Sequence, residues 1–229
     1  NCFVKNGAFI HVAKGVKVEN PIFLHFINHD FVGTRISFVR NIISLAENAQ
    51  ACVVEYFANS NSLAYCTNAV SEVSLKSGSK LNHIKIQNDA TNHYHLGNVS
   101  INQLRDSNYD NFSLSLGGSL ARSEIDTALV EYGASCNING LFLAGNEELS
   151  DFHTIIDHAK SACTSHEYFK GIISGNGNGV FNGRIIVRPG TKNTNSAQTN
   201  KNLLLSKDAL VNTQPVLEIF AEDVKCSHG

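Results

Sequence analysis

The last residues of this chain include two side chains whose types and spacing suit soft-metal chemistry. Cys226 and His228 lie two residues apart, so both point to the same side if this segment is extended. Thiolate and imidazole are the ligand types that iron–sulfur and zinc sites select. Two ligands do not close a site, so a site here would need further ligands from another chain. Taken alone, the spacing favours a structural role.

A group of nearby histidines is the second candidate for metal binding. His93 and His95 would share one face of a strand over residues 92–96, and His83 lies close to them in the sequence. A zinc site needs three or four ligands with a supporting shell, and no cysteine or carboxylate pattern completes one here. We expect these histidines to lie on the surface or between rungs of the fold.

A third group combines histidine with cysteine. His153, His158, Cys163 and His166 follow the pattern His-x4-His-x4-Cys-x2-His, which is not the spacing of a zinc finger. Cysteine–histidine catalysis would also need an orienting partner and an oxyanion loop, and the sequence identifies neither. The pattern therefore predicts a structural or interface role.

A glycine-rich run over residues 174–179 has the composition of a phosphate-binding loop. It lacks the Gly-Lys-Ser/Thr that opens a helix in such loops, and the apolar segment 180–187 that follows is typical of a strand. We predict a turn between two strands.

Paired acidic residues would indicate a polysaccharide lyase or hydrolase, which is one alternative function. The chain has two such pairs, Glu147-Glu148 and Glu222-Asp223, and both are expected at turns or edges rather than in a groove. The other alternative is a purely structural β-solenoid, in which Cys226 and His228 could be replaced without consequence.

Short strands are the elements that must hold these residues. Between residues 4 and 85, apolar segments alternate with period two, and breaks rich in Gly, Asn and Ser recur roughly every 8–12 residues, one of them at residues 59–62. A sandwich, a barrel and a parallel β-helix all fit strands of this length. Asn at the breaks, β-branched strand residues and the absence of Trp favour an all-β parallel β-helix, although no repeat is visible on a scale of about 20 residues. We expect one elongated domain over residues 1–229.

The composition excludes several classes of protein. With 18 basic and 20 acidic residues, the chain has no excess of positive charge for binding nucleic acid. No apolar run reaches the roughly 20 residues of a membrane helix. The lack of an initiator Met indicates a fragment. Reduced, cytosolic thiols are expected of the six scattered cysteines, which are Cys2, Cys52, Cys66, Cys136, Cys163 and Cys226.

From about residue 140 onwards, short motifs in a fixed order carry a family resemblance. They are His153-Thr154 with Asp157-His158, Cys163-Thr164-Ser165, Phe169-Lys170-Gly171-Ile172, Gly179-Val180-Phe181-Asn182-Gly183-Arg184-Ile185, Asn202-Leu203-Leu204-Leu205, Pro215-Val216-Leu217-Glu218-Ile219 and Asp223-Val224-Lys225-Cys226-Ser227-His228-Gly229. These motifs resemble the SufB/SufD family of iron–sulfur cluster assembly proteins. Residues 1–140 resemble the family only in their pattern of short strands.

Within that family, the final run resembles the SufD type. The SufB type is expected to carry an acidic residue near the histidine position and a cluster-related cysteine where this chain has Asn200. The resemblance therefore implies a subunit that does not build a cluster alone.

The resemblance also implies a fold and a role. The expected fold is a right-handed, single-stranded parallel β-helix, with the flanking helical regions of the family absent from this fragment. The expected role is a non-catalytic scaffold subunit that pairs with a SufB-like subunit and is coupled to a SufC-like ATPase, or forms a homodimer in isolation. No nucleic-acid or membrane partner is expected, and the expected location is the cytoplasm, or the plastid stroma in a plant or alga.

The same resemblance assigns expectations to four residues. His228 is the expected contributor at the interface with the SufB-like subunit and Cys226 a second candidate, so that iron or a nascent cluster binds there transiently and no cofactor is held stably. His153 and His158 occupy motif positions, and we expect structural roles for both.

Overall fold

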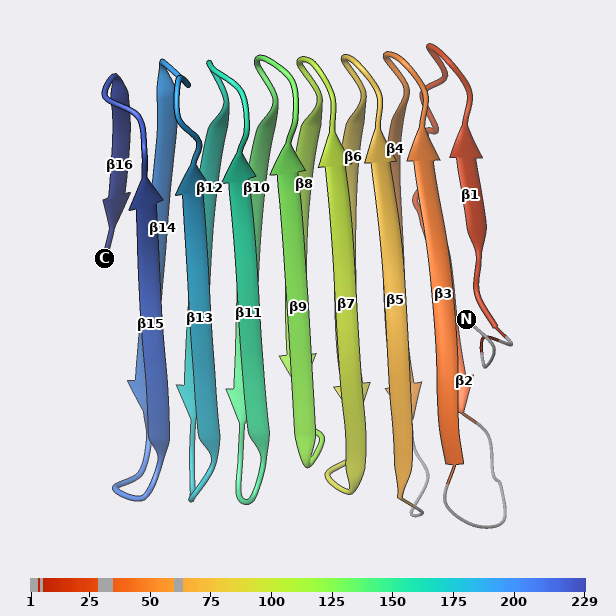
Figure 1. Ribbon diagram of the computed structural model, residues 1–229. Helices are drawn as coiled ribbons and strands as arrows, with labels where there is room; N and C mark the ends of the chain where they lie inside the picture. Colours follow the sequence, from red (N-terminus) through yellow and green to blue (C-terminus); the bar gives the residue numbers. More distant parts are fainter. Residues whose placement is uncertain (1–3, 5, 29–34, 60–63) are drawn as a thin grey trace.

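A computed structural model describes residue 4 and residues 6–28, 35–59 and 64–229 of the chain. This part forms sixteen β-strands and no helix (Figure 1), which confirms the all-β prediction. It therefore contains no helix able to cross a bilayer. Cys2 and most of the predicted break at 59–62 lie outside the described residues.

The strands form two parallel eight-stranded sheets. The first sheet contains the odd-numbered strands β1 (Phe9–Val12), β3 (Arg35–Leu45), β5 (Tyr65–Leu75), β7 (His93–Gln103), β9 (Leu120–Leu129), β11 (Leu149–His158), β13 (Asn178–Val187) and β15 (Leu210–Ile219). The second sheet contains β2 (Ile22–Asn28), β4 (Gln50–Asn59), β6 (Lys80–Asp89), β8 (Asn108–Leu116), β10 (Ser135–Ala144), β12 (Thr164–Ile173), β14 (Thr194–Leu204) and β16 (Val224–His228).

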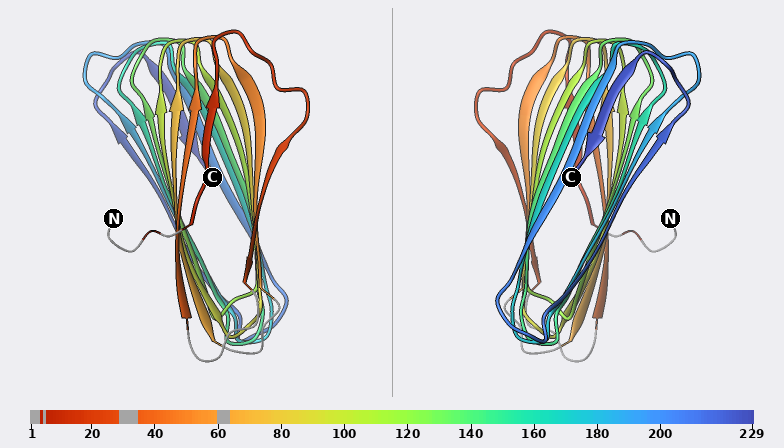
Figure 2. Two further views of the ribbon diagram at one scale, coloured as in Figure 1. Left: turned by 90° about the vertical axis from the view of Figure 1, so that its right-hand side faces the viewer. Right: turned by 90° about the vertical axis from the view of Figure 1, so that its left-hand side faces the viewer.

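The chain winds these sheets into a right-handed β-solenoid, as predicted. It rises along each strand of the first sheet, crosses to the second sheet and descends there, while it advances from the N-terminal to the C-terminal end (Figure 1). Figure 2 views the stack along its axis and shows the two sheets facing each other. Equivalent positions in neighbouring coils lie about 30 residues apart, as Ser165 and Ser196 do at 31, so a repeat sought at about 20 residues could not appear.

Residues with a left-handed backbone conformation form corners of the coils. Asn48 and Asn193, which lie at breaks between strands, adopt positive φ angles of 57° and 55°, a conformation that Asn tolerates better than most residues. The glycine-rich run forms the predicted turn, with Gly175 at φ 60° and β13 beginning at Asn178.

Alternation of side chains gives each strand an inner and an outer face. In the C-terminal half the inner face is aromatic, where the buried rings of Phe142, Phe152, Phe169 and Phe181 follow one another at centroid distances of 5.8, 5.1 and 4.9 Å. These rings fill the space between the two sheets and hold the last coils together.

Candidate functional site

The terminal strand β16 positions the predicted ligand pair. It pairs with β14 in the parallel register Thr194↔Val224 to Gln198↔His228. Val224 and Cys226 pack against the end of the core, which explains why this short segment is extended. In the described part of the chain, the other edge of β16 has no neighbouring strand. The pair therefore lies at an open end of the solenoid.

Cys226 and His228 lie on the same face of β16. Cys226 is half-buried, and burial raises the pKa of its thiol. Metal binding at this sulfur would therefore have to displace a proton. His228 is exposed, although its register neighbour Gln198 is only 1% exposed. One ligand is thus shielded by the last coil and the other is accessible to a partner.

A buried polar column leads to Cys226. His158 Nε2 lies 2.9 Å from Ser165 Oγ, which lies 2.7 Å from Ser196 Oγ. Cys226 follows Ser196 in register on β16. Burial lowers the pKa of His158 to about 4, so this imidazole is neutral at physiological pH. His158 is therefore part of the packed interior, and its hydroxyl partners continue toward the terminal strand.

A second buried column leads to His228. Glu167, Gln198 and His228 follow one another in register on β12, β14 and β16. Gln198 Nε2 donates a hydrogen bond of 2.5 Å to Glu167 Oε2. Burial raises the pKa of Glu167 to about 7, although hydrogen bonds from Thr154 and Gln198 oppose the shift. The sequence analysis identified neither Glu167 nor Gln198.

Replacing Glu167 with glutamine should raise the free energy of unfolding at pH 8 by about 3 kcal/mol. The pKa of Glu167 is higher in the folded protein than its unfolded value of 4.5. Its contribution to the free energy of unfolding is therefore fully present below pH 4.5 and is lost as the pH rises through 7. An amide does not titrate and can still accept the Gln198 N–H. Urea unfolding should show this gain at pH 8 and no gain at pH 4.5. An equal effect at both pH values would contradict the prediction.

The two histidines at motif positions lie on opposite faces of β11. His158 points inward, whereas His153 is outside and lies 2.9 Å from Asp151 Oδ1. Arg122 Nη1 also contacts Asp151, at 2.6 Å. His153 thus belongs to an ion-pair network on the outer surface.

The predicted His-x4-His-x4-Cys-x2-His pattern does not form a cluster. His166 is exposed, while Cys163 is fully buried and its thiol donates to the carbonyl of Glu131 at 3.2 Å. Among the described residues, no group of three or more His, Cys, Asp or Glu could hold a metal ion. A site at Cys226 and His228 would therefore need further ligands from outside the described residues.

The histidines of the N-terminal half lie inside the solenoid, so of the two placements expected for them, on the surface or between rungs, the surface one is wrong. His83, His93 and His95 are 0, 1 and 1% exposed. His95 Nδ1 lies 3.2 Å from Asp89 Oδ2, and burial lowers the pKa of His95 although Asp89 opposes the shift.

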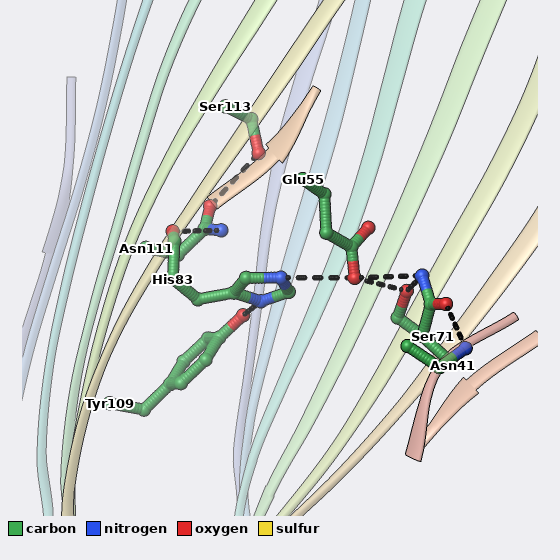
Figure 3. Close-up of polar contacts among 8 residues, drawn as sticks. Asn41, Glu55, Ser71, His83, Tyr109, Asn111 and Ser113 are labelled. Carbon is green, nitrogen blue, oxygen red and sulfur yellow. Dashed lines mark hydrogen bonds and ion pairs between the residues drawn. The ribbon is translucent and has the colours of Figure 1, made fainter. Parts of the chain in front are cut away.

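His83 belongs to a buried polar network that the sequence analysis missed (Figure 3). Glu55 Oε1 accepts hydrogen bonds from Ser71 at 2.7 Å and from Asn41 at 3.2 Å, and lies 3.4 Å from His83 Nε2. His83 Nδ1 in turn lies 2.9 Å from the hydroxyl of Tyr109. The strict alternation of His83, Lys85 and Gln87 on β6 was the available signal.

The acidic pairs lie at turns, as predicted. Glu147 has a positive φ of 60°, and Glu148 accepts a hydrogen bond of 2.6 Å from the backbone N–H of Gly145. Glu222 and Asp223 directly precede β16. The Glu148 carboxylate thus has a local structural partner, and the other three acids lie at a turn or directly before a strand, so the pairs add no support to a polysaccharide-cleaving site.

Comparison with known proteins adds family relationships to this geometry. Residues 26–229 match the family model described as "SUF system FeS cluster assembly, SufBD core domain". The iron–sulfur cluster assembly protein SufD of Escherichia coli is 33% identical over 96% of this chain and 52% of its own length. Protein ABCI7, chloroplastic, of Arabidopsis thaliana is 32% identical over 96% of this chain and 48% of its own length. The chain thus spans about half the length of these relatives.

Proposed function

Because the chain belongs to the SufBD family of the SUF system of iron–sulfur cluster assembly, we propose that it is a non-catalytic scaffold subunit of a SufBCD-type complex. The observation that carries this proposal is the placement of a thiol and an imidazole on one face of a terminal strand that, in the described chain, has a neighbouring strand on one edge only. In this role, Cys226 and His228 contribute ligands to iron or a nascent cluster that binds transiently. The cluster is the product of the assembly and not a resident cofactor.

The C-terminal end of the solenoid suits a protein partner. β15 and β16 are the last strands of their sheets, and in the described chain each leaves one edge without a neighbour. Such edges accept a further strand through main-chain hydrogen bonds. Leu210, Ile219 and Phe220 are exposed beside them at 58, 41 and 60%. We propose that a SufB-like subunit, or a second copy of this chain, pairs there.

The ligand chemistry supports a site shared between subunits. A neutral imidazole is a competent iron ligand near pH 7, and a cysteine thiolate from the partner would supply softer, anionic coordination. At the position where the SufB type is expected to have its cysteine, Asn200 donates from Nδ2 to the carbonyl of Phe169 at 3.4 Å. This chain therefore supplies the imidazole and relies on its partner for that thiolate.

Two further elements of the proposal, the docking site of the ATPase and the cellular location, concern the longer protein. We place the docking site of a SufC-like ATPase in the additional sequence of the longer protein, since the relatives are about twice as long. One relative is named chloroplastic, and we propose the cytoplasm or the plastid stroma as the site of action.

Replacing His228 with alanine should reduce the cluster content of the complex at least about tenfold, because a metal ligand is lost. The full-length protein would be co-purified with SufB-like and SufC-like subunits, and iron and acid-labile sulfide would be measured. Ser227→Ala is the matched control, since Ser227 lies between the two ligands and points to the other face.

Two results would oppose the proposal in different ways. Failure of all three proteins to form a complex would reject the scaffold assignment. A stable complex whose cluster content is equal in the His228→Ala and Ser227→Ala variants would keep the assignment and reject the ligand role of His228.

A further inference from the structure

We propose that the side-chain amide of Gln198 orients the imidazole of His228, which makes Gln198 a positioning residue for the ligand. This inference rests on the proposed function, because it concerns how His228 is presented to iron. It assigns a role to a buried residue 30 positions earlier in the chain, on the neighbouring strand.

The register of the second sheet brings the two side chains together. Gln198 on β14 and His228 on β16 are direct partners in a parallel pair, so both project from the same face of the sheet. The pairing continues past this position, since Gly229 N–H donates to the Gln198 carbonyl and Asn200 N–H donates to the Gly229 carbonyl, each at 2.9 Å. The side chain of His228 thus starts one strand nearer the C-terminal end of the solenoid than the side chain of Gln198.

The amide of Gln198 is held in one orientation. Its Nε2 donates to Glu167 Oε2 at 2.5 Å, and the ionised form of this carboxyl, which predominates at pH 8, can only accept at this contact. The carbonyl oxygen Oε1 is therefore the end of the amide that remains available to accept a hydrogen bond. In the described part of the chain, this buried oxygen has no hydrogen-bond partner. A buried acceptor without a partner is unfavourable, so its presence calls for an explanation.

The opposite sheet makes room for the same amide. An ideal Cβ on Gly183 of β13 would overlap Gln198 Nε2 and would lie 2.8 Å from Phe181 Cζ. Gly183 therefore allows the amide to lie against the backbone of the opposite sheet. The position of Gln198 is set from two directions, by Glu167 on its own sheet and by Gly183 across the interior.

An acceptor at this position matches what a histidine ligand requires. Metal-bound imidazole generally donates its second ring N–H to a carboxylate or carbonyl oxygen, which fixes the tautomer and the ring orientation. Gln198 Oε1 can accept that N–H, and the other ring nitrogen of His228 then presents its lone pair at the open end. Because His228 is exposed at the end of the solenoid, its ring is free to turn toward the amide.

The test is the tautomeric state of His228 in the full-length protein. Histidine labelled with nitrogen-15 would be observed by NMR at pH 8, and the His228 signals would be assigned by their absence in His228→Ala. In the unmodified protein we expect one tautomer. Gln198→Met keeps the side-chain length but removes the acceptor, so we expect a mixture of tautomers. Gly183→Ala, which displaces the amide, should act in the same direction.

Ser196→Ala is the matched control. Ser196 lies on the same strand and the same inner face as Gln198, but it is in register with Cys226. This variant should keep the single tautomer of the unmodified protein. The inference is overturned if His228 has the same tautomer distribution in the unmodified protein and in Gln198→Met, provided that the other histidine signals show both proteins folded.

Cluster content separates this inference from the proposed function. If both stand, Gln198→Met should lower the cluster content of the co-purified complex about 10–100-fold. A changed tautomer in Gln198→Met, together with equal cluster content in His228→Ala and Ser227→Ala, would support the positioning role and reject His228 as a ligand. Loss of clusters in His228→Ala without any change of tautomer in Gln198→Met would keep the proposed function and reject the inference.

Discussion

Replacing Glu55 with glutamine should lower the free energy of unfolding by about 3–5 kcal/mol at pH 7. Glu55 is fully buried and faces His83 (Figure 3). Lys85, its register partner on β6, is also buried. Burial alone would raise the pKa of Glu55, but the hydrogen bond and charge of His83, with Lys85 and Ser71, lower it to about 2. The carboxylate is thus the counter-charge of a buried basic group, and an amide cannot replace that charge.

Urea unfolding would measure this loss, with Glu72→Gln as the control. Glu72 forms an ion pair of 2.7 Å with Arg40 on the outer face of the same half of the solenoid, where both side chains are partly exposed. The control should change the free energy of unfolding by about 1 kcal/mol or less. Equal losses in the two variants would contradict a special contribution from the buried charge.

The pH dependence gives a second readout for the same variant. The folded-state pKa of Glu55 lies below the unfolded value of 4.5, so its contribution is present above that pH and is lost as the pH falls toward 2. Glu55→Gln should remove this part of the acid dependence. Parallel stability profiles of the two proteins between pH 5 and pH 2 would contradict the ionised state of Glu55.

Replacing Phe169 with alanine should lower the free energy of unfolding by about 3–5 kcal/mol. The ring is fully buried, with its centroid 5.1 Å from that of Phe152 and 4.9 Å from that of Phe181. A Cβ on Gly140, its register partner in the preceding coil, would overlap the ring. The neighbouring coil therefore lacks a side chain at this position, and alanine would leave an unfilled cavity.

Tyr168→Ala is the control for this variant, because Tyr168 is the adjacent residue of β12 and points outward with 37% exposure. Its loss should be clearly smaller, since less apolar surface leaves the core. Chemical unfolding of both variants would measure the difference. A loss at Phe169 no greater than that at Tyr168 would show that the aromatic interior does not determine the stability of the last coils.

The sequence by itself predicted the strands, their corners and the family. Period-two alternation indicated which residues share a face, as for Cys226 and His228, because successive side chains of a strand point to opposite sides. Turn composition identified the corner at Gly175, because glycine adopts positive φ without strain. Both properties are local, so a short stretch of sequence is enough to reveal them.

Only the tertiary structure decided which face of each strand lies inside. On β6 the buried face carries His83 and Lys85, while Ile84 and Ile86 are on the outer face, the reverse of the usual arrangement. Alternation reports that two faces differ, but burial depends on the opposite sheet and on the coils above and below. Glu55 provides the carboxylate that pairs with His83, and it lies 28 residues earlier in the chain.

The surroundings of the candidate site were decided in the same way. Glu167 and Gln198 are 31 residues apart, and they meet because parallel pairing places corresponding positions of successive coils one strand spacing apart. The length of a coil is not constant, since Cys136 pairs with Ser165 after 29 residues and Ser165 with Ser196 after 31. No fixed period in the sequence therefore marks these columns. The candidate ligands could be read from adjacent residues, whereas the buried groups in register with them become neighbours only when the coils stack.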